Sequence, residues 1–200
     1  MTSAEPRRRC RRLLLCATGA YQCVTLPAFI LSLLRHVADD VEVVLSASAA
    51  KLVSPLAVAA ASHHPVHVGT PGDEGEADGP PLQLDSFDLV LVYPATANIV
   101  GKVANGLADD SVSAIVLAAS APVVFVPFAN PAMWSHPPVP RNLARLAEMG
   151  YVVLPPQSGV EVATREGLAA LSDPFPLPTL LPRIAAALAA GSGIGRARRP

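Results

Sequence analysis

Short apolar runs alternate along the chain with segments of helical periodicity. The runs are rich in Val, Leu and Ile, as is typical of buried strands, and they lie at 13–17, 41–45, 66–68, 88–93, 123–126 and 151–154. After the first run, apolar residues recur at three- and four-residue intervals from Leu26 to Leu34, which predicts a helix. Further helices are expected at 49–61, 98–107, 111–119, 139–149 and 180–190. This alternation predicts an α/β fold with a parallel, doubly wound sheet.

Both ends of the chain are expected to lie outside a single domain. The arginine-rich start and the leucines after it imitate a signal peptide, but Thr18 and Gly19 interrupt the apolar run. A membrane span would need roughly 20 mostly apolar residues. We therefore predict a cytoplasmic protein without a membrane partner. Its expected parts are a basic extension over 1–11, a domain over 12–190 that carries a mobile loop at 69–81, and a flexible tail over 191–200.

The composition narrows the class of protein. Apolar residues make up 51% of the 200 residues and charged residues only 16%. Because 15 Lys and Arg balance 16 Asp and Glu, the chain lacks the basic excess of a nucleic-acid binder. A surface with so little charge indicates contacts between subunits. The three cysteines, Cys10, Cys16 and Cys23, match no zinc spacing and predict reduced thiols without a metal.

Small and hydroxyl residues follow three of the expected strands. They are found at 18–20 (TGA), 46–48 (SAS) and 94–98 (PATAN). The carboxyl ends of parallel strands meet at one edge of a sheet, where ligands bind. Small side chains permit close approach of a ligand, and hydroxyls add hydrogen-bond donors, so the three ends together indicate a nucleotide-like ligand. The sequence contains neither a dinucleotide fingerprint nor a P-loop, which disfavours a dinucleotide or ATP.

Three segments resemble motifs of the homo-oligomeric flavin-containing cysteine decarboxylases. They have the family's order and spacing and are found at 94–99 (PATANI), 105–110 (NGLADD) and 127–134 (PFANPAMW). The resemblance runs from about Leu13 to Pro156. It implies a single-domain, flavodoxin-like, three-layer sandwich that binds FMN at a subunit interface. It also implies assembly into trimers or dodecamers, which would account for the charge-poor surface.

The resemblance also implies roles for individual residues. Asn130 matches the asparagine that holds the substrate carboxylate. Met133 and Trp134 close the same segment, although simple core packing explains them equally well. Arg165, in a segment that would cover the substrate, is a candidate partner for an acidic group, or else a solvated surface residue. The expected FMN contacts are Thr18, Gly19, Ala20, Ser46, Ser48, Pro94, Ala95, Thr96, Ala97, Asn98 and Phe128.

Two departures from the family bear on the reaction. The family's catalytic histidine is absent, because the chain has Pro81-Leu-Gln-Leu84 where that histidine begins a motif. Either the reaction runs without it, or a nearby histidine replaces it; we take His64 as the catalytic candidate, beside His63 and His67, while a solvated turn explains all three as well. The motif methionine is replaced by Ala129, which would enlarge the pocket.

The second departure concerns the step after decarboxylation. The chain has no cysteine after Cys23, whereas the phosphopantothenoylcysteine branch uses a late cysteine to reduce its ene-thiol product. The region from Pro156 to Arg165 instead resembles the lantibiotic- and linaridin-type peptidyl-cysteine decarboxylases. By that resemblance, FMN oxidises the C-terminal cysteine of a ribosomally made precursor peptide to a thioaldehyde, CO2 leaves, and the ene-thiol serves aminovinyl-cysteine formation. The alternatives are a phosphopantothenoylcysteine decarboxylase of coenzyme A synthesis, a flavin prenyltransferase and a non-catalytic flavin-binding subunit.

Overall fold

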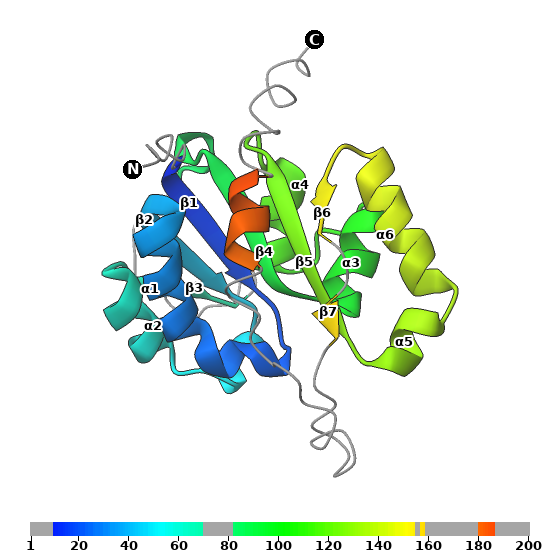
Figure 1. Ribbon diagram of the computed structural model, residues 1–200, viewed down its shortest axis with the longest axis horizontal. Helices are drawn as coiled ribbons and strands as arrows, with labels where there is room; N and C mark the ends of the chain where they lie inside the picture. The colour runs from blue at the N-terminus through cyan, green and yellow to red at the C-terminus, as the bar shows by residue number, and fades with distance from the viewer. Residues whose placement is uncertain (1–9, 70–81, 155–156, 159–179, 187–200) are drawn as a thin grey trace, which may run out of the picture.

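The computed structural model describes residues 10–69, 82–154, 157–158 and 180–186 and forms one parallel sheet between two layers of helices (Figure 1). The strand order is β3-β2-β1-β4-β5-β6, and β7 pairs with the end of β5. Every pairing is parallel, which confirms the predicted sheet. The strands are β1 (Cys10–Ala17), β2 (Ala38–Leu45), β3 (Val66–Val68), β4 (Leu89–Thr96), β5 (Val123–Ala129), β6 (Val152–Val153) and β7 (Gln157–Ser158).

Helices cover both faces of this sheet. One face packs against α1, α2 and the helical residues 180–186, and the other packs against α3, α4 and α6. This is the predicted three-layer, flavodoxin-like arrangement. The α-helices are α1 (Leu26–His36), α2 (Pro55–Ser62), α3 (Ala97–Ala104), α4 (Ser111–Ala118), α5 (Pro131–Ser135) and α6 (Pro138–Glu148). Short 3₁₀ turns are found at η1 (Tyr21–Thr25), η2 (Ala49–Lys51) and η3 (Leu84–Ser86).

Strand β1 runs through the centre of the core. Its side chains alternate between the faces: Leu13 and Leu15 belong to the cluster under α1, whereas Leu14 and Cys16 belong to the cluster under α3 and α4. All four are fully buried. Burying one leucine side chain stabilises the fold by about 1.5–3 kcal/mol. A strand buried on both faces reads as a continuous apolar run, which explains why the sequence pattern located it.

The structure differs from the expected elements in several places. The helix expected over 49–61 is split, because Ser54 is extended (φ −66°, ψ 123°) before Pro55 and the helix begins only at the proline. Helix α3 ends at Ala104, where the chain turns through Gly106 with φ 72°. Strand β1 begins at Cys10, inside the stretch expected to be an extension. Helix α5 and strand β7 were not predicted. The loop at 70–81 and the tail at 191–200 lie outside the described residues.

Two features are absent from the part of the chain that the structure describes. No helix in that part of the chain is long and apolar enough to cross a membrane. No group of three or more His, Cys, Asp or Glu side chains lies together there as a metal site. The three cysteines are buried and form no disulfide. Burial raises the pKa of the Cys16 thiol to about 12 and, against a small opposing effect of the Ala20 backbone, that of Cys23 to about 11, so both thiols are protonated at neutral pH.

Candidate active site

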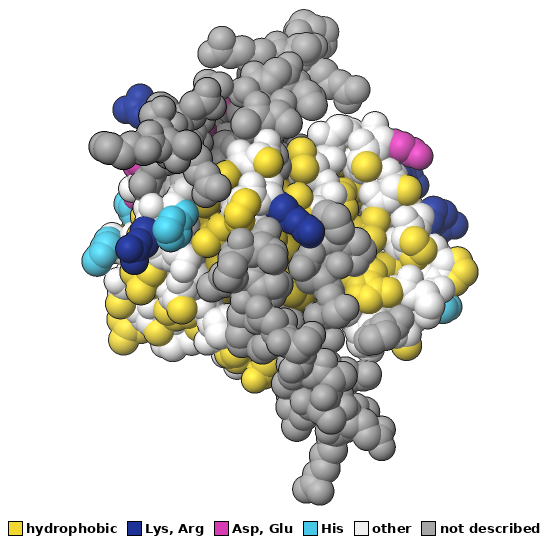
Figure 2. Space-filling view, in the orientation of Figure 1, with side chains coloured by type: hydrophobic (Ala, Val, Ile, Leu, Met, Phe, Trp, Pro, Cys, Tyr) yellow, Lys and Arg dark blue, Asp and Glu magenta, His cyan; other side chains and the backbone are white. Residues whose placement is uncertain are grey.

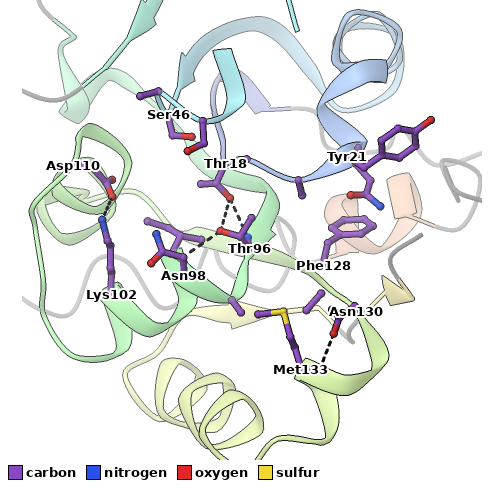
Figure 3. A pocket seen from close by; sticks show the side chains of 18 of the residues that line it. Thr18, Tyr21, Ser46, Thr96, Asn98, Lys102, Asp110, Phe128, Asn130 and Met133 are labelled. Atoms are coloured by element: carbon purple, nitrogen blue, oxygen red, sulfur yellow. Dashed lines mark hydrogen bonds and ion pairs between the residues drawn. The ribbon is translucent and has the colours of Figure 1, made fainter. Parts of the chain in front are cut away.

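A cleft of about 530 Å³ opens at the carboxyl edge of the sheet (Figure 3). It gathers the ends of β1, β2, β3, β4 and β5, which the strand order brings side by side. Polar and small side chains dominate its walls, as the three strand ends predict. The lining residues are Thr18, Gly19, Ala20, Tyr21, Gln22, Ser46, Ala47, Ser48, Gly69, Thr96, Ala97, Asn98, Ile99, Lys102, Asp110, Phe128, Ala129, Asn130 and Met133.

Thr18 and Thr96 join the two central strands at the floor of the cleft. The Thr18 hydroxyl donates to the Pro94 carbonyl at 2.7 Å and accepts from the Thr96 backbone N–H at 3.0 Å. The Thr96 hydroxyl lies 3.1 Å from it and caps α3 by accepting from the Ile99 N–H at 3.5 Å. Thr18 is only 5% exposed. Its hydroxyl therefore holds the end of β4 in place and is already occupied by protein partners.

Gly19 lets the loops after β1 and β2 approach each other closely. A Cβ atom at this position would lie 2.5 Å from the Ser48 Cβ, well inside van der Waals contact. Ser46, at the start of the second loop, accepts from the Ala49 N–H at 3.2 Å and so shapes that loop. The Ser48 side chain is exposed at the rim of the cleft. Because Gly19 has no side chain, the backbone of the first loop can lie directly against Ser48 of the second loop.

The charged residues among the described lining neutralise each other. Lys102 on α3 lies 2.6 Å from Asp110 and 2.8 Å from Asp109. Hydrogen bonds to Asp109 and Asp110 raise the pKa of Lys102. Burial alone would raise the pKa of Asp110, but hydrogen bonds from Lys102 and Ser113 outweigh it and lower that pKa. A bound anion therefore meets hydroxyl and backbone N–H donors here rather than a free cation.

An aromatic stack supports the opposite wall. Phe128, at the end of β5, packs edge-on against Tyr93 with ring centroids 5.5 Å apart, and Tyr93 packs on Phe29 at 4.0 Å. Tyr93 is fully buried, and its hydroxyl has no hydrogen-bond partner among the described residues. Burial, and then the neighbouring Cys23, raise the pKa of Tyr93, so the phenol is neutral. The stack holds Phe128 rigidly at the edge of the cleft.

Asn130 and Met133 form the end of the cleft nearest β5 (Figure 3). The Asn130 side-chain oxygen accepts from the Met133 N–H at 2.8 Å and caps α5. Within the described part of the chain, the Asn130 NH2 group has no hydrogen-bond partner. The cap therefore fixes the side chain through its oxygen and leaves its two N–H donors for a ligand.

Most of the residues proposed from the sequence come together in this cleft. Eleven of them line it: Thr18, Gly19, Ala20, Ser46, Ser48, Thr96, Ala97, Asn98, Phe128, Asn130 and Met133. Pro94 and Ala95 lie in β4 and do not line the cleft, although the Pro94 carbonyl holds Thr18. Trp134 lies on α5 outside the lining, and its buried indole N–H has no hydrogen-bond partner in the segments that the structure describes. Arg165 lies outside the described residues.

His64 is the one expected catalytic residue that the geometry separates from the cleft. Its ring lies 2.6 Å from Asp40, near the start of β2. The cleft begins beyond Leu45 at the other end of that strand, roughly 16 Å away at about 3.3 Å per residue. Helix α2 ends just before His64 and the chain then enters β3, so the turn belongs to the amino edge of the sheet. All 5 histidines lie in described segments, and none lines the cleft.

Four residues of the lining lie outside every segment that the sequence singled out as a motif or ligand contact. Tyr21 and Gln22 lie in η1, for which the sequence predicted no element, and Gly69 follows the short strand β3. Lys102 follows Asn98 by four residues, one helical turn, and that spacing was the available signal for it. Tyr21 and Gln22 carry no comparable signal, because only the packing of η1 directs them toward the cleft.

A flavodoxin-like sheet with a ligand cleft at its carboxyl edge is typical of proteins that bind nucleotide-like ligands such as FMN. A family model described as Flavoprotein matches residues 1–177, and the chain belongs to this family. That result confirms the predicted family and supports FMN, the predicted cofactor.

Curated relatives and solved structures lie within the same family. The coenzyme A biosynthesis bifunctional protein CoaBC of Bacillus subtilis is 36% identical over 82% of this chain, which spans 40% of that protein's length. Mouse phosphopantothenoylcysteine decarboxylase is 32% identical over 88% of this chain and 87% of its own.

Two solved FMN-dependent cysteine decarboxylases share the fold. TvaF, from thioviridamide biosynthesis, is 32% identical with a TM-score of 0.63 and covers 80% of this chain and 94% of its own. SpaF is 30% identical with a TM-score of 0.69 and covers 91% of this chain and 97% of its own. These structures agree with the predicted three-layer fold.

Proposed function

We propose that this protein is an FMN-dependent cysteine decarboxylase that acts on the C-terminal cysteine of a ribosomally made precursor peptide. The product would be an ene-thiol for aminovinyl-cysteine formation. The observation that carries the proposal is the cleft itself, because Asn130 and the segment 96–98 both line it in a member of the Flavoprotein family. The structural likeness to TvaF and SpaF supports the same reaction class.

The residues of the cleft fit FMN. Gly19 presents backbone without a side chain to the cleft, Ser46 and Ser48 offer hydroxyls, and Phe128 offers a flat apolar wall. A phosphate would be held by hydroxyl and backbone N–H groups, because Lys102 is already paired with two carboxylates. When bound, FMN supplies the oxidising power, since it accepts two electrons from the cysteine side chain.

Asn130 orients the substrate in this proposal. Its capping oxygen fixes the side chain, and its NH2 group donates to the substrate carboxylate. An amide is a neutral donor and stabilises the carboxylate less than a cation would. Because the negative charge leaves this carboxylate as CO2 is lost, a weak ground-state interaction orients the group without holding back the reaction.

The peptide substrate is favoured by the cysteine pattern. No cysteine follows Cys23, so the chain has no late thiol for reduction of an ene-thiol. Phosphopantothenoylcysteine is the second candidate substrate, because the curated relatives CoaBC and the mouse enzyme act in that branch by name. Both substrates carry the free carboxylate of a cysteine. They differ in the group that is joined to the nitrogen of that cysteine through the amide bond.

We also propose that the chain assembles with copies of itself, as trimers or dodecamers. Large apolar side chains are exposed, among them Tyr21 and Met133 in the lining of the cleft and Val24 in η1. Figure 2 shows hydrophobic side chains spread over the face in view with few charged ones between them. Light scattering during gel filtration measures the assembly directly; a monomer at micromolar concentration would refute it.

The substrate is tested by mass spectrometry with two compounds offered in parallel. A peptide ending in cysteine that loses CO2 and two hydrogens supports the proposal. Loss of CO2 from phosphopantothenoylcysteine, with or without loss of two hydrogens and with the peptide unchanged, would assign the chain to the coenzyme A branch. Transfer of a prenyl group to FMN would identify a prenyltransferase. FMN binding without turnover of any substrate would identify a non-catalytic subunit.

A further inference from the structure

A buried glutamine lines the cleft with an unpaired side-chain amide. Gln22 lies in η1, just after the end of β1, and is only 2% exposed. Its backbone carbonyl accepts from the Thr25 hydroxyl at 3.1 Å. Its side-chain amide makes no hydrogen bond within the described part of the chain. Gln22 is one of the residues that line the cleft, so a molecule bound there can reach its side chain.

The fold gives no reason for a glutamine at this position. A buried amide without a partner costs free energy relative to an apolar side chain of the same shape. The neighbouring Cys23 is packed in the apolar core, and leucine would fill the space of Gln22 without an unpaired group. The amide is therefore retained for a partner that is not part of the folded chain.

The position of Gln22 indicates what that partner offers. Tyr21 and Phe128 stand on one side of the cleft, away from the Lys102–Asp110 pair (Figure 3). Gln22 also lines the cleft and directly follows Tyr21 in η1. A primary amide presents a donor beside an acceptor. A phosphate or carboxylate would satisfy only the donor. The matching group is an N–H next to a C=O, which occurs in the imide edge of a flavin ring and in a peptide bond.

We propose that Gln22 is a recognition residue whose amide makes a paired donor–acceptor hydrogen bond with an N–H/C=O edge of the bound molecule. The identity of that molecule rests on the proposed function: the edge belongs either to FMN or to the backbone of the substrate. Gln22 positions this edge on the Phe128 side of the cleft, while Asn130 holds the carboxylate at the β5 end.

The test compares the full-length wild type with Gln22→Leu and Gln22→Glu. Leucine removes both hydrogen-bonding groups, and glutamate keeps the shape but removes the donor. Thr25→Val is the matched control, since it alters the hydrogen bond within η1 and leaves the amide in place. The readouts are the FMN dissociation constant from flavin fluorescence, the KM for a peptide ending in cysteine at saturating FMN, and the melting temperature of the flavin-free chain.

Gln22→Leu is expected to raise one of the two binding readouts by about 10- to 100-fold and to leave the melting temperature unchanged or higher. A raised FMN dissociation constant assigns the partner to the flavin, and a raised KM alone assigns it to the peptide. Changes below twofold in both readouts overturn the proposal, as does a lower melting temperature, which a purely structural glutamine would give. The FMN dissociation constant is measured without turnover. An error in the proposed peptide substrate can therefore be distinguished from an error in the proposed role of Gln22.

Discussion

Replacing Asn130 by aspartate separates substrate orientation from folding. The Asn130 oxygen caps α5 by accepting from the Met133 N–H at 2.8 Å. An aspartate oxygen caps a helix as well as an asparagine oxygen, so the variant keeps this hydrogen bond. The substitution exchanges only the outer half of the side chain, an NH2 donor, for a carboxylate oxygen.

The expected loss of activity follows from two effects. Removing a hydrogen bond to a charged group costs about 1.5–3 kcal/mol. Placing a carboxylate about 4 Å from the substrate carboxylate costs about 4 kcal/mol at an effective dielectric constant near 20. Together these predict that kcat/KM falls by about 10⁴- to 10⁵-fold.

The assay measures peptide decarboxylation by mass spectrometry, with FMN absorbance and thermal unfolding recorded on the same samples. The Asn130→Ser control keeps a capping oxygen and introduces no charge, and it is expected to lose only about 10- to 100-fold. Both variants should retain FMN and the wild-type melting temperature. If Asn130→Asp turns over within tenfold of the wild type while binding FMN, the assigned role of Asn130 is wrong.

Three further predictions concern the walls of the cleft. Gly19→Ala forces apart two loops that meet at Ser48, where the new Cβ would lie 2.5 Å from the Ser48 Cβ; we expect a loss of about 1–3 kcal/mol in unfolding free energy and weaker FMN binding in a fluorescence titration. Thr18→Val leaves a buried carbonyl and N–H unpaired and should cost about 1–3 kcal/mol in urea unfolding, whereas Thr18→Ser should restore most of it. Asp110→Asn should remove about 0.5–1 kcal/mol at pH 7, because the pKa of Asp110 is lowered and that of Lys102 is raised in the folded state. The Asp110 contribution is present above its unfolded pKa and is lost as the pH falls through its folded pKa, so unfolding curves of Asp110→Asn and wild type should converge in acid; an equal difference at pH 3 and pH 7 would contradict the ion pair.

The residues that form the core could be recognised from the sequence because burial leaves a regular pattern. Leu13 to Ala17 forms a continuous apolar run, since β1 is covered on both faces. The residues after β1, β2 and β4 could likewise be assigned to one cleft, because parallel strands end at a common edge. The sequence also indicated the family, because three of its segments have the order and spacing of the family's motifs.

Other features depended on contacts between residues far apart in the chain. Thr18 is an expected FMN contact, and only the structure shows that its hydroxyl is paired with Pro94 and Thr96, which lie more than seventy residues away. The sequence places His64 near the missing histidine, yet the direction of β2 places its ring at the opposite edge of the sheet.

What the sequence alone determined is therefore the layered fold, its strands and the edge that binds a ligand, because each follows from local periodicity and chain direction. Only the tertiary structure decided which side chains remain free for a ligand. Gln22 and the Asn130 NH2 group are unpaired in the described part of the chain, whereas Thr18 and Lys102 are paired. The physical reason is that a hydrogen-bonding group is available only when no distant part of the chain satisfies it, and local sequence carries no record of such partners.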